Sequence, residues 1–341
     1  MRKLTGFFFL FFSVVTLAQE SLFTLLDNSE TGINFSNDLV DTKQHSIFLY
    51  ANYYGGAGVG IGDFDNDGLD DIFFAANLTD DKIYKNLGNF QFEDKTEKSG
   101  IINNGSWSTG VTVADVNNDG LLDIYVSCEL YDDAPILRKN KLYINKGNFK
   151  FEESAEKWGV DVERRTRHSV FFDYNNDGLL DLYLLNHPPN TGNFSPFFGT
   201  DMTLPEYNLQ LFENKGDYFI DVTIAAGLDR AGFPNAAVIG DFNKDGWADI
   251  YVANDFDAPD FLYFNNQDGS FSYKTESSLR HTSFYSMGVD AADINNDSYL
   301  DLMVLDMTAE DNFRLKSNMS GMNPDSFWNV VKGGRSLSIH V

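Results

Sequence analysis

The chain reads Asp63-Phe64-Asp65-Asn66-Asp67-Gly68-Leu69-Asp70-Asp71 between two short apolar segments. This nine-residue pattern has Asp or Asn at positions 1, 3 and 5, Gly at position 6 and Asp at position 9. It returns three more times in full and once with a single change. Successive copies start 52, 58, 68 and 52 residues apart, and the later ones occupy 115–123, 173–181, 241–249 and 293–301. A block that recurs at such spacing indicates a repeat architecture, and we number its acidic loops 1 to 5.

A second motif alternates with these loops. It has an aromatic residue two positions before an Asn, then a turn, a short aromatic segment and often a Gly-containing tail, in copies at 82–101, 141–160, 210–228 and 261–279. Together the two motifs predict four short strands per unit, which in the third unit lie at 169–172, 182–185, 211–213 and 218–220. Four-stranded units in line are typical of β-propeller blades, whereas the strands of a β-sandwich do not repeat as a block.

We therefore expect an all-β fold, an incomplete β-propeller of about five blades, with each acidic loop between the first and second strands of its blade. Residues 23–33 resemble 92–101, so we expect them to supply an outermost strand. Residues 307–341 carry neither motif and are expected to be a truncated or divergent segment. The blades then occupy 19–306.

The first 18 residues have the pattern of a signal peptide. A basic start, Met1-Arg2-Lys3, precedes an apolar run that ends at Leu17, and Thr16 and Ala18 are small residues before the expected cleavage point. No later apolar run approaches the length of a membrane-spanning helix. We therefore expect export to the periplasm, the outer surface or the medium. The one cysteine, Cys128, excludes an internal disulfide and is expected to be a small core residue.

Charge limits the classes of partner. The chain has 51 acidic and 25 basic residues, a formal net charge of -26, yet 43% of its residues are hydrophobic, so it can bury a core. Such a charge repels phosphate backbones and anionic lipid, which argues against nucleic-acid and membrane-surface binding. Cations are the partners that this charge favours.

The acidic loops have the donors that calcium requires. Ca²⁺ takes six to eight oxygen ligands, and alternate residues of a tight turn converge on one point. Positions 1, 3, 5 and 9 offer side-chain oxygens and position 7 its backbone carbonyl. We predict up to five Ca²⁺ ions, held in chain order by Asp63, Asp65, Asp67, Leu69 and Asp71; Asp115, Asn117, Asp119, Leu121 and Asp123; Asp173, Asn175, Asp177, Leu179 and Asp181; Asp241, Asn243, Asp245, Trp247 and Asp249; and Asp293, Asn295, Asp297, Tyr299 and Asp301.

Other interpretations of the loops fit less well. Asp, Asn and Gly are ordinary turn residues, but five copies in one register are improbable on that ground alone. An EF-hand needs Glu at position 12, which is apolar in every copy here. Without an ion the clustered carboxylates would repel one another and their pKa values would rise. Loop 5 has Ser298 where the others have Gly at position 6, so we expect that site to be strained or weaker.

The alternating motifs resemble the FG-GAP or VCBS repeats of integrin-α-like propellers over about 23–306. The runs GVGIGDFDNDG (58–68), KLYINKG (141–147) and NMSGMNP (318–324) are similar to the N-terminal propeller of bacterial proteins related to cartilage acidic protein, the ASPIC/UnbV group. This resemblance implies calcium at the loop positions named above.

Two classes of function remain open. The first is a non-catalytic recognition, adhesion or scaffold module for a protein or glycan ligand, with the insert 186–207 and its Phe194, Phe197 and Phe198 as the candidate surface. The alternative is a calcium-dependent hydrolase or lyase acting on an anionic polysaccharide or phosphoester. For that alternative the basic cluster Arg164, Arg165, Arg167 and His168 would face a central channel. No nucleophile-elbow or Ser-His-Asp pattern is visible, so no catalytic residue is predicted.

Overall fold

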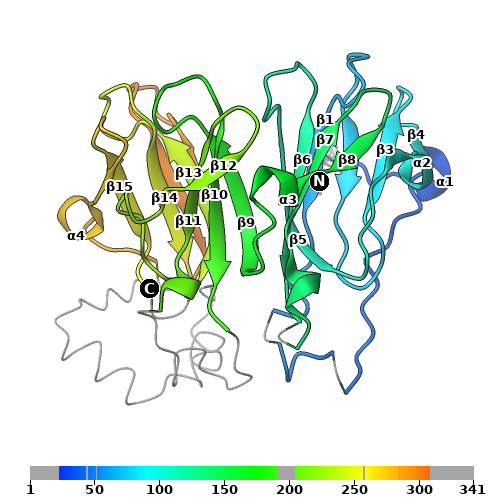
Figure 1. Ribbon diagram of the computed structural model, residues 1–341, viewed down its shortest axis with the longest axis horizontal. Helices are drawn as coiled ribbons and strands as arrows, with labels where there is room; N and C mark the ends of the chain where they lie inside the picture. The colour runs from blue at the N-terminus through cyan, green and yellow to red at the C-terminus, as the bar shows by residue number, and fades with distance from the viewer. Residues whose placement is uncertain are drawn as a thin grey trace, which may run out of the picture.

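The structure is a computed structural model, and it describes residues 23–307 apart from 44, 51, 132, 190–203, 256–257 and 284. The signal-peptide pattern, the three phenylalanines of the insert and residues 308–341 lie outside the described residues. In the described part, strands form four antiparallel sheets of four strands and one sheet of two strands (Figure 1). The chain is an all-β propeller built from consecutive blades, as the repeats predict.

Each blade is one sheet whose strands follow sequence order. Blade 1 contains β1 Val59–Gly62, β2 Asp71–Phe74, β3 Lys82–Asn86 and β4 Phe92–Asp94; blade 2 contains β5 Trp107–Ala114, β6 Asp123–Glu129, β7 Lys141–Asn145 and β8 Phe151–Glu153. Blade 3 contains β9 Arg165–Phe172, β10 Asp181–His187, β11 Gln210–Asn214 and β12 Phe219–Asp221; blade 4 contains β13 Pro234–Gly240, β14 Asp249–Asn254, β15 Phe261–Asn265 and β16 Phe271–Tyr273. The fifth blade has β17 Ser286–Ala292 and β18 Asp301–Asp306.

Short helices lie mainly after the outer strands. They are α1 Asn28–Thr31, α2 Thr96–Ser99, α3 Ala155–Trp158 and α4 Thr275–Ser278, and two 3-10 turns, η1 Pro135–Arg138 and η2 Pro205–Tyr207, precede third strands. Gly100 ends α2 in the left-handed region at φ 90°. A Cβ on Gly100 would collide with the Phe151 carbonyl of the next blade. The tail of one blade thus packs against the outer strand of the following blade.

The core lies between blades rather than inside one blade. The first strands contact one another in succession, β1 with β5, β5 with β9, β9 with β13 and β13 with β17. Phe64 and Phe73 of blade 1 pack with Ile124 and Tyr143 of blade 2, and two further buried clusters join blades 2 and 3 and blades 3 and 4. Cys128 is fully buried in the first of these clusters, so the prediction that it is a core residue is confirmed.

Residues 23–33 match only part of the strand prediction. Their second half forms α1, which ends at Gly32 with φ 75°, and Gly32 lies against the Phe92 carbonyl as Gly100 lies against Phe151. Residues 23–27, however, form no strand. Phe23 and Leu25 are 88% and 98% exposed, because no described strand lies beside them to form a ladder.

Burial in the fifth blade shows how much each blade depends on the next. Phe73 and Tyr125 are the third residues of β2 and β6, and both are fully buried. Met303 holds the same position in β18 and is 58% exposed. Among the described residues no blade follows the fifth, so this face has no neighbour to cover it.

Candidate metal centre

The five acidic loops occupy equivalent places. Each one links the first and second strands of its blade, and its position-9 Asp is the first residue of the second strand. Position 4 has a positive φ in every loop, 55° to 62°, and so has position 6, with Gly at 83° to 88° in loops 1 to 4. Ser298 adopts φ 67° at position 6 of loop 5, a conformation that costs a side chain energy. The expected strain in loop 5 is therefore present in the backbone.

The position-1 Asp organises each turn. Asp63 accepts hydrogen bonds from the Asp67 and Gly68 amides, at 3.0 and 2.7 Å. Its counterparts Asp115, Asp173, Asp241 and Asp293 make the same pair of bonds. The loop is thus wrapped around its first carboxylate before any ligand is considered.

The position-9 Asp is buried between backbone donors. Asp123 accepts from the amides of Val116 and Asn145, at 3.0 and 2.7 Å. Burial raises the pKa of its carboxyl to about 7, against the lowering effect of these bonds, and Asp115 and Asp119 add repulsion. Burial likewise raises the pKa of Asp181 to about 7, and those of Asp71 and Asp249 to about 6. A nearby cation stabilises the ionised form of such buried carboxyl groups.

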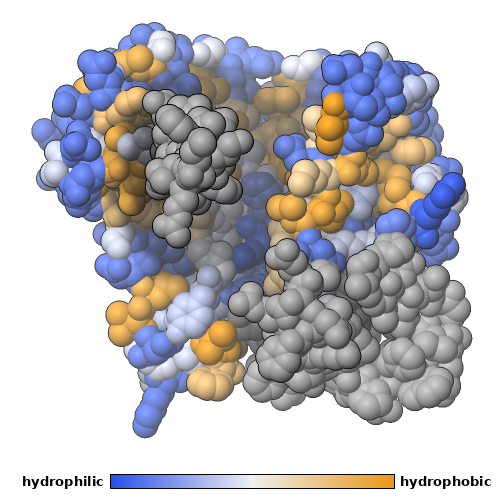
Figure 2. All heavy atoms as spheres, turned by 180° about the vertical axis from the view of Figure 1, so that it is seen from behind, coloured by the Kyte–Doolittle hydropathy of each residue, from blue (hydrophilic) through white to orange (hydrophobic). Residues whose placement is uncertain are grey.

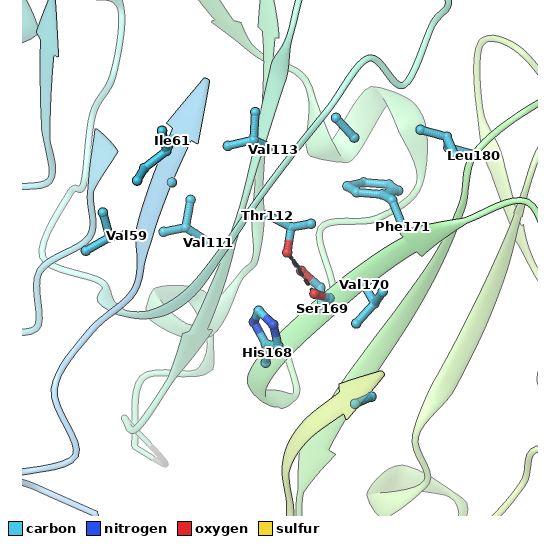
Figure 3. A pocket seen from close by; sticks show the side chains of 13 residues that line it. Val59, Ile61, Val111, Thr112, Val113, His168, Ser169, Val170, Phe171 and Leu180 are labelled. Carbon is cyan, nitrogen blue, oxygen red and sulfur yellow. Dashed lines mark hydrogen bonds between the residues drawn. The ribbon is translucent and has the colours of Figure 1, made fainter. Parts of the chain in front are cut away.

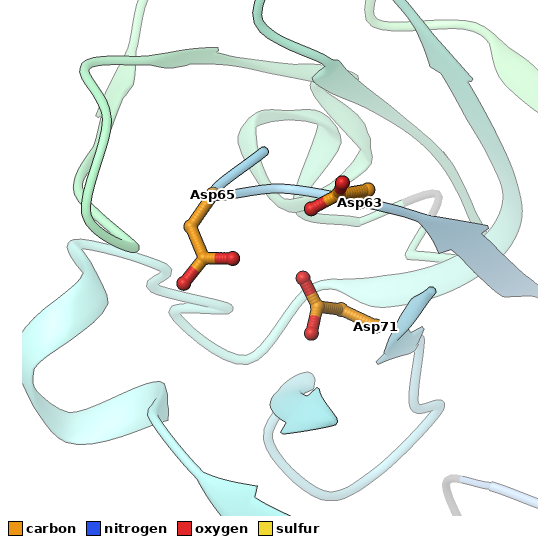
Figure 4. Close-up of side chains that lie close together, drawn as sticks. All are labelled: Asp63, Asp65 and Asp71. Atoms are coloured by element: carbon orange, nitrogen blue, oxygen red, sulfur yellow. The ribbon is translucent and has the colours of Figure 1, made fainter. Parts of the chain in front are cut away.

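Loop 1 has the densest set of acids. One oxygen each from Asp63, Asp65 and Asp71 lies within 4.8 Å of the others, and Figure 4 shows the three carboxylates around one shared space. The Oδ1 atom of Asp65 is buried and has no hydrogen-bond partner. An all-oxygen set with an unpartnered carboxylate oxygen fits a hard cation such as Ca²⁺. Loops 2 to 5 carry Asn at position 3, where loop 1 has Asp65.

A lysine lies at the edge of loop 1. Lys85 Nζ donates to Oδ2 of both Asp65 and Asp67, the latter at 2.7 Å. Burial disfavours the ammonium, but these two bonds outweigh it and hold the pKa of Lys85 above its ordinary value. The sequence did not indicate this contact, because Asp65 in the loop and Lys85 in β3 are 20 residues apart.

The Asn of the second motif joins neighbouring blades beside the loops. Asn145 Nδ2 donates to the Phe64 carbonyl of the preceding blade at 2.9 Å, and also to Leu122 in its own blade at 3.0 Å. Asn214 and Asn265 repeat the first bond to Val116 and Tyr174, at 2.9 and 2.8 Å. The motif therefore fastens position 2 of each preceding loop.

A second set of links at the opposite ends of the strands was also missed. Asp81 and Asp260 directly precede third strands, and their Oδ2 atoms accept from Ser108 and Ser286 of the following blade, at 3.1 and 3.0 Å. In blade 2 Asn140 donates instead to Thr166 at 2.8 Å. A signal was present, since these hydroxyl residues all stand seven positions before the following acidic loop.

An open central cavity of about 580 Å³ is lined mainly by residues of the first strands (Figure 3). Most of its lining residues have apolar side chains, among them Val59, Val111, Val170 and Phe171, and Thr112 is bonded to Ser169 at 2.8 Å. From behind, the molecule is hollowed along its middle, with hydrophobic residues on both sides (Figure 2).

The basic cluster does not gather on this cavity. His168 is the one ionisable side chain among the described residues that line it, and burial, with Arg167 nearby, lowers its pKa. Arg167 lies 3.7 Å from the buried Glu129 carboxylate, and Arg164 donates to the carbonyls of Pro205 and Asn208, both at 3.0 Å. Arg164 and Arg167 are not among the described residues that line this cavity, and both have partners elsewhere. That the basic cluster faces a central channel stays a prediction.

Comparison with known proteins gives three kinds of similarity. A family model described as an FG-GAP-like repeat matches residues 38–126 and 241–304. Cartilage acidic protein 1 of Xenopus tropicalis is 26% identical over 164 residues, which are 48% of this chain and 24% of that protein. The Homo sapiens protein is 25% identical over 212 residues, 60% of this chain and 29% of that protein. The chain thus spans less than a third of the length of these relatives.

Two solved structures are similar to the chain at a low level. An Agrocybe aegerita lectin that recognises non-reducing terminal N-acetylglucosamine has a TM-score of 0.41 and 18% identity, over 72% of this chain and 59% of that one. The V. cholerae biofilm matrix protein Bap1 has a TM-score of 0.32 and 16% identity, over 65% and 30%. Within the described residues, no helix has the length and apolar character needed to cross a membrane.

Proposed function

Because the chain belongs to the FG-GAP-like repeat proteins and is related to cartilage acidic protein 1, we propose that it is an exported propeller that binds Ca²⁺ in its acidic loops and serves as a recognition or adhesion module. The ligand proposed is a protein or a glycan. Export is inferred from the basic and apolar pattern of residues 1–18.

The observation that supports calcium most directly is the carboxylate cluster of loop 1. Asp63, Asp65 and Asp71 place oxygens around one space, and Asp65 Oδ1 has no other partner. In each loop the residues at positions 1, 3, 5 and 9 would hold the ion with the position-7 carbonyl. When bound, Ca²⁺ neutralises carboxylates that burial and mutual repulsion otherwise destabilise.

Recognition is preferred to catalysis because of the central cavity. Most of the residues that line it have apolar side chains, its hydroxyl residues Thr112 and Ser169 bond to each other, and Arg164 and Arg167 are engaged elsewhere. The described residues that line it include no lysine or arginine that could bind an anionic polysaccharide or phosphoester. The acidic loops, by contrast, form a row of similar turns at one end of the strands, where propellers present binding loops.

Calorimetry of the chelator-treated protein tests the calcium proposal. Titration with Ca²⁺ should release or absorb heat with an apparent stoichiometry of up to five, and Mg²⁺ should compete poorly. At millimolar Ca²⁺ each occupied loop should add about 1 kcal/mol to the free energy of unfolding, so the melting temperature should rise by several degrees. Absence of both heat and a shift in melting temperature would refute the proposal. A glycan array probed with and without EDTA tests recognition separately.

A further inference from the structure

The residue before the second-motif Asn differs in charge from blade to blade. It is the fourth residue of the third strand, and the register of β3, β7, β11 and β15 on their second strands is the same. The position holds Lys85 in blade 1, Ile144 in blade 2, Glu213 in blade 3 and Phe264 in blade 4. Glu213 is itself paired with Lys215 at 2.5 Å. Lys85 is therefore the one cation at this position in the four complete blades that the structure describes.

Lys85 takes over a hydrogen bond that other loops make for themselves. In loops 2, 3 and 4 the position-3 Asn donates through Nδ2 to Oδ2 of the position-5 Asp, at 3.0 Å in each case. Asp65 has no such donor. Lys85 Nζ instead bonds Oδ2 of Asp65 and of Asp67 and so ties positions 3 and 5 together.

The same contact places a positive charge beside the cation site. Asp65 Oδ2 is held by the ammonium and its Oδ1 has no hydrogen-bond partner, while one Asp65 oxygen lies within 4.8 Å of oxygens of Asp63 and Asp71. A divalent ion bound there and the Lys85 ammonium would share the Asp65 carboxylate. Both partners are mostly buried, with side chains 20% and 17% exposed, so water and salt screen their interaction only in part.

We propose that Lys85 is a built-in competitor for the cation of loop 1 and makes this loop the weakest calcium site of the propeller, although it carries the most acids. The inference rests on the proposed function, since it assumes that the loops bind Ca²⁺. Loop 1 then fills last as the Ca²⁺ concentration rises, and its occupancy depends on ionic strength more than that of the other loops.

The test is Lys85→Ile, the residue that blade 2 carries at this position. Calorimetric titration with Ca²⁺ should show the weakest binding step of the full chain tightened by about tenfold at low salt, and by less in 1 M salt. Lys85→Met keeps an unbranched stem but lacks the ammonium, which lies 5.4 Å from the centre of the Phe149 ring, and should give the same result, which guards against a folding defect of the first variant. An unchanged or weakened step in both variants would overturn the inference.

Two controls locate the effect. Lys82→Ile removes a lysine that is paired with Asp94 on the surface, 3.1 Å away, and should leave all binding steps unchanged. In an Asp63→Asn background, where loop 1 has lost its first carboxylate, Lys85→Ile should give no gain, and a gain there would count against loop 1 as its origin. If the wild-type chain binds no Ca²⁺, the proposed function itself fails. If it binds Ca²⁺ but the Lys85 variants bind it with unchanged affinity, only the present inference fails.

Discussion

At the scale of single residues, the acidic loop depends on two left-handed positions. Asn or Lys occupies position 4 and tolerates positive φ at a cost, while Gly occupies position 6 in four loops at almost none. Ser298 makes the same bond to the position-1 Asp as Gly does, from its amide to Asp293 at 2.7 Å. Loop 5 thus keeps the wrapped geometry and stores strain at one residue.

Replacing Ser298 by Gly should relieve that strain. We expect Ser298→Gly to raise the free energy of unfolding by about 0.5–1 kcal/mol, since glycine adopts φ near 67° without a Cβ clash. The matched reverse change, Gly246→Ser in loop 4, should lower it by about 1–2 kcal/mol. Urea denaturation in EDTA measures both. No gain from Ser298→Gly, or no loss from Gly246→Ser, would mean that backbone strain at position 6 does not affect stability.

At the scale of elements, the third strand of a blade does more than complete its sheet. Its terminal Asn bonds the position-2 carbonyl of the preceding loop, as Asn214 does with Val116. Asn86 in blade 1 donates only within its own blade, to Asp70 at 2.8 Å. The same residue type therefore serves as an inter-blade link in three blades and as a local one in the first.

This difference gives a matched pair of substitutions. Asn214→Ala removes the donor to the buried Val116 carbonyl and the partly buried Leu180 carbonyl and should cost about 2–4 kcal/mol of unfolding free energy. At the half-buried Asn86, the same change should cost about 1 kcal/mol. Chemical denaturation followed by tryptophan fluorescence measures the two losses. If the costs proved equal, the bond between blades would contribute nothing beyond the local turn.

At the scale of the whole molecule, hydrogen bonds join neighbouring blades at both ends of the strands. The acidic loops and their asparagines lie at one end, and Asp81 and Asp260 link blades at the other. Burial raises the pKa of both carboxyls, more than the bonds they accept lower it. The folded chain therefore holds protons on these groups at pH values where the unfolded chain has lost them.

The sign of the resulting pH dependence follows from linkage. Stability from the protonated Asp260 is fully present near and below its ordinary pKa of 3.8 and is lost as pH rises through the higher folded value. Asp260→Asn, which copies Asn140 of blade 2, should flatten this fall and be the more stable protein at pH 8. Urea denaturation from pH 4 to pH 8 in EDTA tests it, with the exposed Asp80→Asn as control. A parallel shift at every pH would contradict the prediction.

The sequence by itself determined the blades and the loops. Strand periodicity, the turn residues and the spacing of loop acids act within one unit of the chain, so the four strands of blade 3 and the place of loop 1 between β1 and β2 were predictable. Only the tertiary structure decided how the units meet. Lys85 beside Asp65, Asn214 on Val116 and Asp260 on Ser286 join residues 20, 98 and 26 positions apart. Such contacts depend on how strands and blades pack against one another. The repeat fixes where Ser286 stands in its blade, but not which residue of the neighbouring blade it meets.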